Sequence, residues 1–305
     1  MDLKKLFIGI DSGGTNCRIG LGGNSGKIIH SGKFESVHYS QAGAKAFAAH
    51  ISKIINDFCA GINLELRSVS GVCAGAAGAR HRQDKQRIKE HLSDMLSFSN
   101  IIVESDSEIA YQSAFGDGDG LLMICGTGSI LFGKRKGVEV RIGGWGKLLG
   151  DEGSSYSLSL GMLRRLAVRI DETNEAGELE ICLRNEFGLT RENLLNEIYH
   201  KNFSMQSLAP LVVRLAGEGE NICRETADSD VEGLLRLFRT YRKRFSDSVP
   251  TDVAFLGSVI ENENYISSSL RKGIENEFGN AFVISEERIN TVKGAIKTAI
   301  KYFNE

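Results

Sequence analysis

The stretch LFIGIDSGGTNCRIGL (residues 6–21) decides the fold, because it joins two apolar runs through a turn of small and polar residues. The first run predicts a buried strand, and the adjacent Gly13 and Gly14 allow a tight turn into a second strand. Such a turn is either an ordinary β-hairpin or half of a nucleotide clamp, whose backbone N–H groups point at phosphates. Thr15 and Asn16 would add side-chain donors to the clamp. A Walker A loop is excluded, since no Gly-Lys-Ser/Thr follows the turn.

The same pattern returns in GLLMICGTGSILFGKRKG (residues 120–137), which again reads apolar strand, small-residue turn, apolar strand. The distance between the copies matches two related domains better than a short-period repeat. Two such turns, one in each half, would grip a triphosphate from both sides. At the end of the first strand, the Asp11 carboxylate is suited to hold Mg²⁺ or its water. The second clamp would consist of Gly126, Thr127, Gly128 and Ser129.

Composition excludes several classes of protein. The chain has 305 residues, 41% of them hydrophobic, and a formal net charge of -2, so one or two domains are expected. That balance favours neither a nucleic acid nor a membrane as partner, and the apolar runs are too short to span a bilayer. Six cysteines lie far apart without metal-ligand spacing, which favours reduced core thiols. With no signal-peptide pattern at the start, we expect a cytoplasmic protein.

Periodicity in the first part predicts three consecutive strands and then alternating helices and strands, as in a mixed α/β sheet with helices packed on it. The second part begins with two strands, becomes largely helical and then returns to strand and helix. We therefore expect a first domain over residues 1–116, completed by a C-terminal helix at 290–305, and a second over 117–289 with a helical insertion at about 155–248. The expected strands are 5–11, 17–23, 27–34 and 100–106, with a strand that runs into a small-residue loop within 66–78, a strand within 251–260 that ends in Gly257 and Ser258, and a strand at 281–285. The expected helices are 43–61, 84–96, one that begins near Glu108, 156–170, 179–188, 191–201, 208–219, 230–247 and 265–279.

The densest small-residue stretch is GGWGKLLGDEGSSYS (residues 143–157), which contains the only tryptophan of the chain. Adjacent acids, Asp151 and Glu152, follow the bare backbone of several glycines. Carboxylates accept hydrogen bonds from hydroxyl groups, and an aromatic face covers the C–H surface of a ring, so the stretch favours a polar-ligand pocket. The alternative is a helix start, with Ser154 as N-cap and the acids beside it.

Two strand ends leave alternatives open. In IIVESDSEIA (residues 101–110), Asp106 lies where a buried strand passes into a helix. It is either the N-cap of that helix or a general base at the carboxyl end of a sheet, where open α/β sheets bind ligands. Gly257 and Ser258 follow the apolar run VAFL. They suit close approach of an adenosine or form an ordinary strand end.

The motifs IGIDSGGTNCRIGL, VESDSEIA, CGTGS, GGWGKLLGDEGSSYSL and AFLGSV occur together in the order seen in N-acetylglucosamine kinases of the BadF/BadG type. The chain resembles that family, within the actin, heat-shock-protein and hexokinase superfamily, over nearly its whole length. GGWG followed by GDEGS is the specific part of the resemblance. It implies two ribonuclease-H-like domains of the actin-like ATPase fold, with the active site in the cleft between them.

The resemblance also implies the roles of individual residues. Asp106 would be the base that takes a proton from the sugar hydroxyl, and Asp11 would position Mg²⁺. The product would be an amino sugar phosphorylated on its 6-hydroxyl by ATP. ATP would meet the two glycine turns and an adenosine site formed by Ala216, Gly257 and Ser258, and the sugar would meet His38, Tyr39, Ala74, Gly75, Gly144, Trp145 and Asp151.

Departures from the family pattern bear on the choice of sugar. In FESVHYSQAG (residues 34–43), Val37 and Tyr39 replace an Asn and a Trp that the animal enzyme offers to the sugar, and Ala74 replaces a Ser. Fewer polar contacts imply a different or broader specificity, which brings in N-acetylmuramic acid beside N-acetylglucosamine. The cluster Arg80–Arg82 either meets the lactyl carboxylate of that sugar or is a solvated helix start.

Besides a structural, filament-forming role, which fold alone does not exclude, three other functions stay open at this point. One is a glucosamine or other hexose kinase of the same fold. Another is the iron–sulfur ATPase activator of a 2-hydroxyacyl-CoA dehydratase, which Cys125 beside the second turn brings to mind, although its apolar strand favours a core thiol. The third is a sugar-sensing transcription regulator, which the absence of a basic footprint disfavours. Dimers are common in the family, which leaves a homodimer open.

Overall fold

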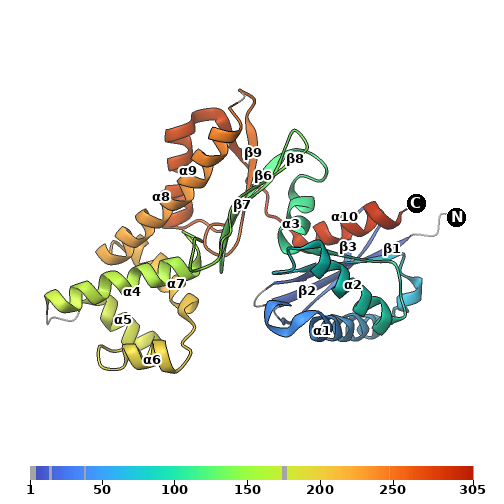
Figure 1. Cartoon of the computed structure of the whole chain (residues 1–305), viewed down its shortest axis with the longest axis horizontal. Helices are drawn as coiled ribbons and strands as arrows, with labels where there is room; N and C mark the ends of the chain where they lie inside the picture. The colour runs from blue at the N-terminus through green and yellow to red at the C-terminus, as the bar shows by residue number, and fades with distance from the viewer. Residues whose placement is uncertain (1–4, 14–15, 38, 174–176, 247, 305) are drawn as a thin grey trace. The chain divides into compact units, whose positions relative to one another are not determined.

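The computed structural model describes residues 5–304 except 14–15, 38, 174–176 and 247. The chain divides into two compact units, the first formed by residues 1–118 and 289–305 and the second by residues 119–288. Each unit contains one five-stranded mixed sheet with helices packed on it (Figure 1). The expected α/β class with two mixed sheets is confirmed.

The first sheet has the order β3-β2-β1-β4-β5. Strands β1, β2 and β3 pair antiparallel, and β4 and β5 add in parallel on the other side of β1. The elements of this unit are β1 (Leu6–Ser12), β2 (Asn16–Gly23), β3 (Ile28–Glu35), α1 (Tyr39–Gly61), β4 (Gly71–Ala76), α2 (Arg82–Leu96), β5 (Ile101–Ser105), α3 (Asp106–Ala114) and α10 (Thr291–Phe303), with a 3-10 turn at Leu66–Ser68.

Alternation along β1 explains how both faces of this sheet are covered. Ile8 and Ile10 point into a core shared with α1 and α2, whereas Phe7 packs with α3 and α10 on the opposite face. Figure 1 shows α10 and the pair α1 and α2 on opposite sides of the sheet. Gly9 lies on the α10 face, where an added Cβ would come 2.6 Å from the Val292 carbonyl oxygen. The bare strand therefore lets α10 pack directly against the sheet.

The second sheet repeats this arrangement in the order β8-β7-β6-β9-β10. Three antiparallel strands are again followed by two parallel ones. The elements are β6 (Gly120–Cys125), β7 (Ser129–Arg135), β8 (Val138–Gly143), α4 (Ser155–Glu172), α5 (Glu178–Phe187), α6 (Leu194–His200), α7 (Ala209–Glu218), α8 (Asn221–Arg244), β9 (Thr251–Leu256), α9 (Tyr265–Phe278) and β10 (Phe282–Ile284), with 3-10 turns at Met205–Leu208 and Gly279–Ala281.

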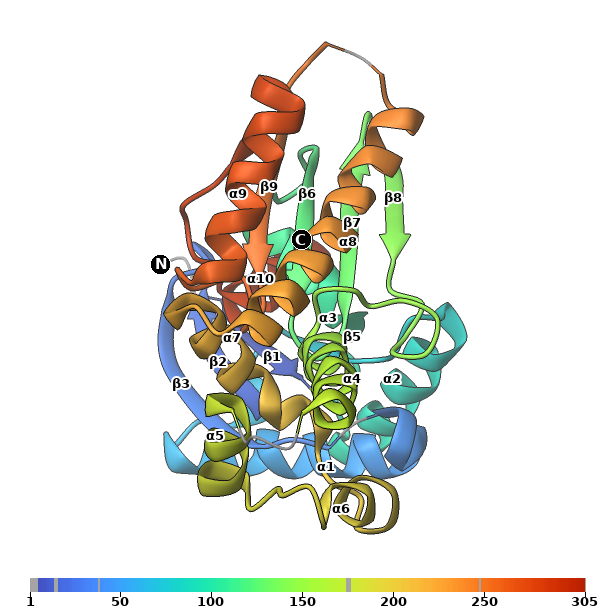
Figure 2. The ribbon, with the colours of Figure 1, turned by 90° about the vertical axis from the view of Figure 1, so that its left-hand side faces the viewer.

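One hydrophobic core joins the second sheet to its helices. It combines inward residues of β6, β7 and β9 with α4, α7, α8 and α9. Figure 2 shows α8 and α9 running beside the strands, with α5 and α6 at the far end of α4. None of the helices in the described part of the chain is long and apolar enough to cross a membrane.

Candidate active site

Asp11 is fixed by one group from the adjacent strand and one from a helix far along the chain. It lies near the end of β1, directly opposite Arg18 in the β1–β2 register, and Arg18 Nη2 donates to Asp11 Oδ2 at 2.8 Å. Asp11 also lies on the face covered by α10, where the Thr291 hydroxyl donates to the same oxygen at 2.6 Å. The carboxylate is buried and meets the first residue of α10, the helix end that favours negative charge.

A magnesium ion fits the chemistry of this carboxylate. Both hydrogen bonds given to Asp11 reach Oδ2, so among the described residues Oδ1 keeps its acceptor capacity. Mg²⁺ is commonly held by one or two carboxylates together with substrate phosphates and water. The described part of the chain contains no group of three or more His, Cys, Asp or Glu side chains able to enclose a metal.

The β1–β2 turn is closed on its own backbone. The Gly13 N–H donates to the Asn16 carbonyl at 3.0 Å, and the Ser36 hydroxyl donates to the Gly13 carbonyl. Gly14 and Thr15, two predicted phosphate-binding residues, lie outside the described residues.

Asp106 is not the N-cap of α3. Ser105 is, since its hydroxyl accepts the Glu108 N–H and the Glu108 side chain accepts the Ser105 N–H. The cap interpretation of Asp106 was therefore wrong, because the strand ends one residue earlier than that interpretation required. Asp106 is the first residue of α3 and is exposed.

The surroundings of Asp106 perturb its acidity. Desolvation by the surrounding protein raises the pKa of the carboxyl group above its ordinary value, and the negative charge of Asp11 acts in the same direction. The Ser107 N–H, 2.9 Å from Oδ1, and the positive charge of Arg80 oppose this increase. A carboxylate of raised pKa with no capping duty is suited to accept a proton.

In the second unit, three segments meet at the β6–β7 turn. The Gly126 N–H donates to the Gly128 carbonyl at 2.9 Å, and the Gly126 carbonyl accepts the Ser155 N–H at 2.7 Å. Ser129 Oγ donates to the Glu152 carbonyl at 2.6 Å. Thr127, at the tip, is exposed. The turn is thus tied to the segment that begins α4.

Gly257 completes this meeting point. Its φ of +107° belongs to glycine, and an added Cβ would lie 2.3 Å from the Cys125 carbonyl oxygen. Ser258 follows Gly257 and is exposed. The Val259 N–H donates to the Cys125 carbonyl oxygen at 3.2 Å. The turns after β6 and β9 therefore pack backbone to backbone.

The 143–153 loop presents an unusual combination of exposed and buried groups. Trp145 is 74% exposed, whereas Asp151 is buried with a φ of +62°. The Gly146 N–H is 3.4 Å from Asp151 Oδ1, and a Cβ at Gly128 would lie 2.9 Å from Asp151 Oδ2. Gly144 has a φ of +67°. The loop thus joins Asp151 to the β6–β7 turn. Ser154 caps α4 by accepting the Ser157 N–H, as the cap interpretation expected.

The other predicted residues are placed as follows. Tyr39 begins α1, and its ring packs edge-on against Phe47. Ala74 and Gly75 are buried in β4, where Gly75 is the register partner of Asp11. Ala216 is fully buried in α7. His38 lies outside the described residues.

Residues 80–82 form an exposed start to α2, as one of the two interpretations held. Cys125 is a buried core thiol whose Sγ donates to the Gly153 carbonyl at 2.9 Å. This agrees with the expected core thiol and removes the feature that suggested an iron–sulfur cluster.

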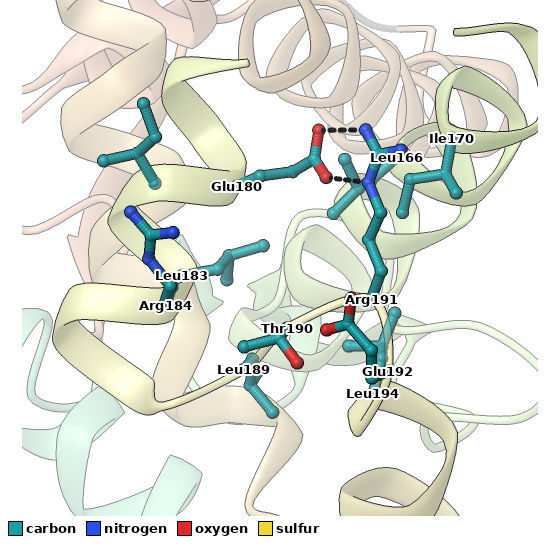
Figure 3. Close-up of a pocket in the computed structure, with 11 residues that line it drawn as sticks. Leu166, Ile170, Glu180, Leu183, Arg184, Leu189, Thr190, Arg191, Glu192 and Leu194 are labelled. Atoms are coloured by element: carbon teal, nitrogen blue, oxygen red, sulfur yellow. Dashed lines mark hydrogen bonds and ion pairs between the residues drawn. The ribbon is translucent and has the colours of Figure 1, made fainter. Parts of the chain in front are cut away.

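A separate pocket of about 340 Å³ lies between α4, α5 and α6, away from the residues above (Figure 3). Its apolar lining includes Leu166, Ile170 and Leu183. Along one side, Arg191 donates to both oxygens of Glu180. The pocket contains none of the predicted site residues.

Fold and site together define a two-unit actin-like ATPase-type protein with one glycine turn in each unit. The chain belongs to the BadF/BadG/BcrA/BcrD ATPase family, whose model matches residues 8–299. Membership in this family implies the use of ATP.

Two curated relatives match nearly end to end. The chain is 27% identical over 293 residues to an N-acetylmuramic acid/N-acetylglucosamine kinase of Clostridium acetobutylicum, covering 92% of this chain and 94% of that protein. It is 28% identical over 302 residues to an N-acetyl-D-glucosamine kinase of Dictyostelium discoideum, with the same coverage.

Solved structures agree in fold. A proposed N-acetylglucosamine kinase from Chromobacterium violaceum superimposes with a TM-score of 0.75 at 22% identity, covering 97% of this chain and 99% of that one. A ROK family glucokinase from Streptomyces griseus, solved with glucose and AMPPNP, gives 0.64 at 15% identity, covering 98% of this chain and 100% of that one.

Proposed function

We propose that this chain is an ATP-dependent kinase that transfers the γ-phosphoryl group of ATP to the 6-hydroxyl of N-acetylglucosamine, N-acetylmuramic acid or both. The observation that carries the proposal is the position of Asp106, an exposed carboxylate directly after the end of β5 that is free of capping duty because Ser105 caps α3. Family membership and the names of both curated relatives support it.

In this proposal the sugar hydroxyl oxygen forms a bond to the γ-phosphorus, and the bond between that phosphorus and the ADP oxygen breaks. Asp106 accepts the proton that the hydroxyl group loses. General-base assistance of this kind contributes about 10²–10⁴-fold in rate. The remaining requirement is alignment and charge neutralisation. The β1–β2 turn of the first unit and the β6–β7 turn of the second are each proposed to bind phosphate, with Gly257 and Ser258 beside the adenosine.

Mg²⁺, when bound at Asp11, neutralises phosphate charge. Arg18 and Thr291 hold the Asp11 carboxylate in one orientation through Oδ2. Oδ1 would therefore be able to hold the ion without rearrangement of the side chain. The sugar meets Trp145 and the buried Asp151 of the 143–153 loop. The exposed indole is suited to cover the apolar face of a sugar ring.

The sugar is the part that the residues constrain least. Val37 and Ala74 offer no hydrogen bond from their side chains where the animal enzyme would have an Asn and a Ser. A site with fewer matched polar groups rejects analogues less strongly. This supports a specificity broad enough for the lactyl ether of N-acetylmuramic acid, as the name of the clostridial relative also suggests.

The test is ADP release from Mg-ATP with N-acetylglucosamine, N-acetylmuramic acid, glucosamine, N-acetylmannosamine and glucose, run on the wild type and on Asp106→Asn. We expect ADP release that depends on an N-acetylated sugar and is lost in the variant. Release that needs no sugar, or a preference for glucose or glucosamine, would contradict the proposal.

A further inference from the structure

One face of α8 supports the segment that carries the predicted sugar-binding residues. Positions 230, 233, 234 and 237 recur at helical spacing, so they lie on one side of the helix. The contacts are the Ser157 hydroxyl with Asp230, Glu152 with Gly233, Gly153 with Leu234, and Gly143 with Leu237. Helices α8 and α4 also pack against each other (Figure 2).

The packing at this interface is close enough to transmit position. A Cβ added at Gly233 would lie 2.6 Å from Glu152 Cβ, and one added at Gly153 would lie 2.6 Å from Leu234 Cδ1. Arg236 forms an ion pair with Glu152 on the exposed side. The backbone of residues 152–153 is therefore held between helix and sheet.

Asp230 is the polar member of this face. Ser157 Oγ donates to its Oδ1 at 2.7 Å, and the Gly153 backbone N–H lies close enough to favour the ionised carboxyl group. Among the described residues, its Oδ2 is nevertheless the single buried side-chain oxygen or nitrogen without a hydrogen bond of standard geometry. Burying a carboxylate oxygen without a partner is unfavourable. Asp230 thus lowers the stability of the fold at a place beside the backbone proposed to bind ligands. Such a cost is typical of residues that serve function rather than stability.

The segment that Asp230 contacts, residues 151–157, is itself hydrogen-bonded to the β6–β7 turn. Ser157 lies in the first turn of α4, and the preceding Ser155 donates its N–H to the Gly126 carbonyl at 2.7 Å. The Glu152 carbonyl oxygen accepts a hydrogen bond from Ser129 Oγ at 2.6 Å, and Glu152 directly follows Asp151. A displacement of the 151–157 segment would therefore move both the predicted phosphate turn and the predicted sugar contact.

We infer that Asp230 is a positioning residue, which through Ser157 fixes the 151–157 segment and with it the β6–β7 turn in their binding geometry. The inference rests on the proposed function for its kinetic consequence. Its structural consequence is independent of that function.

The kinetic experiment compares Asp230→Ala, Ser157→Ala and the double variant. Loss of one hydrogen bond worth about 1 kcal/mol corresponds to about fivefold, so we expect each single variant to raise the KM for sugar or Mg-ATP about fivefold with kcat little changed. Because both remove the same contact, the double variant should be no worse than either single one. Asp230→Asn keeps an acceptor for Ser157 and should restore most of the KM.

Asp228→Asn is the matched control, since this exposed α8 residue contacts Tyr265 of α9 at 2.8 Å and not the 151–157 segment. Its kinetics should equal those of the wild type. Unchanged KM values in Asp230→Ala, or effects that simply add in the double variant, would overturn the inference.

Hydrogen exchange separates this inference from the proposed function. In ligand-free Asp230→Ala, the amides of residues 151–157 should exchange faster than in the wild type, while those of β1 keep their rates. Equal exchange in 151–157 would overturn the inference even if the enzyme phosphorylates sugars. A wild type without sugar-dependent ADP release would overturn the proposed function and leave the exchange result decisive.

Discussion

Thr291 and Asp11 are joined by a 2.6 Å hydrogen bond across 280 positions of sequence. The contact follows from alternation along β1, which turns Phe7, Gly9 and Asp11 toward the helix that Thr291 begins. The orientation of the proposed magnesium ligand is thus set by α10.

Thr291→Val removes this donor while keeping the shape of the side chain. We expect the free energy of unfolding to fall by about 1–3 kcal/mol, as when a buried acceptor loses one partner, and the Mg²⁺ concentration needed for half-maximal activity to rise. Thr298→Val is the control, since the Thr298 hydroxyl donates to Gly294 within α10. Equal Mg²⁺ dependence in both variants would show that Thr291 does not orient Asp11.

The raised pKa of Asp106 predicts the acid limb of the activity profile. The base must be ionised to accept a proton, so kcat/KM should fall as pH decreases through a value above that of an ordinary Asp. In Asp106→Asn, activity should drop about 10²–10⁴-fold and this limb should vanish. A variant that keeps both the limb and the rate would exclude Asp106 as the base. Steady-state rates from pH 4 to 8 provide the measurement.

Gly257→Ala should weaken nucleotide binding. Its positive φ and the 2.3 Å approach to the Cys125 carbonyl leave no place for a methyl group, so the turns after β6 and β9 must separate. We expect a Kd for ATP at least tenfold higher by calorimetry, with sugar affinity less affected. Gly217→Ala in α7, where an added Cβ meets nothing within 4 Å, is the control and should bind ATP normally.

Trp145 gives an optical test of the sugar site, because it is the only tryptophan and is 74% exposed. Covering the indole with a sugar ring should shift its emission to shorter wavelength and protect it from iodide. Titration with N-acetylglucosamine measures both changes. An unchanged spectrum at saturating sugar would place the sugar elsewhere.

Asp230→Asn should stabilise the protein at high pH. Burial raises the pKa of Asp230 from 3.8 to about 6. The charge of Glu152 adds to the increase, whereas the hydrogen bonds from Ser157 and the Gly153 backbone, and the charge of Arg165, oppose it. The folded protein is therefore most stable when Asp230 is neutral. This stability is fully present below about pH 3.8 and is lost as the pH rises through about 6. The difference between these two pKa values corresponds to about 3 kcal/mol. The free energy of unfolding of Asp230→Asn should therefore exceed that of the wild type by up to this amount at pH 8 and be unchanged at pH 3.5. Urea unfolding at both values decides; a gain that is equal at both would contradict the assignment.

The fold was largely predictable because its strands and helices carry strong local periodicity. The exception is β8, which sequence patterns did not indicate because Val138–Gly143 leaves Val138 and Glu139 exposed and follows a charged turn. Helix α8 begins at Asn221, nine residues before the expected start, since its first turns have few apolar side chains. Tertiary packing, rather than propensity, defines both elements.

Glycine turns and isolated acids in the sequence indicated the residues that are proposed as the site, Asp11 and Asp106 among them. Thr291 and Asp230 were missed because each contacts a segment distant in sequence, and no local pattern indicates such a contact. Arg18 was within reach, because antiparallel pairing across the first turn places it opposite Asp11. The roles of all these residues stay predictions.

That α10 belongs to the first unit has a consequence for how the protein is made. During synthesis, residues 1–118 leave the ribosome first, yet the part of the sheet face that α10 covers beside α3 stays open until residues 291–303 emerge. The second unit has all its elements before then and can fold earlier. Phe7 and its apolar neighbours beneath α10 therefore stay open to chaperones while the whole second unit is being made.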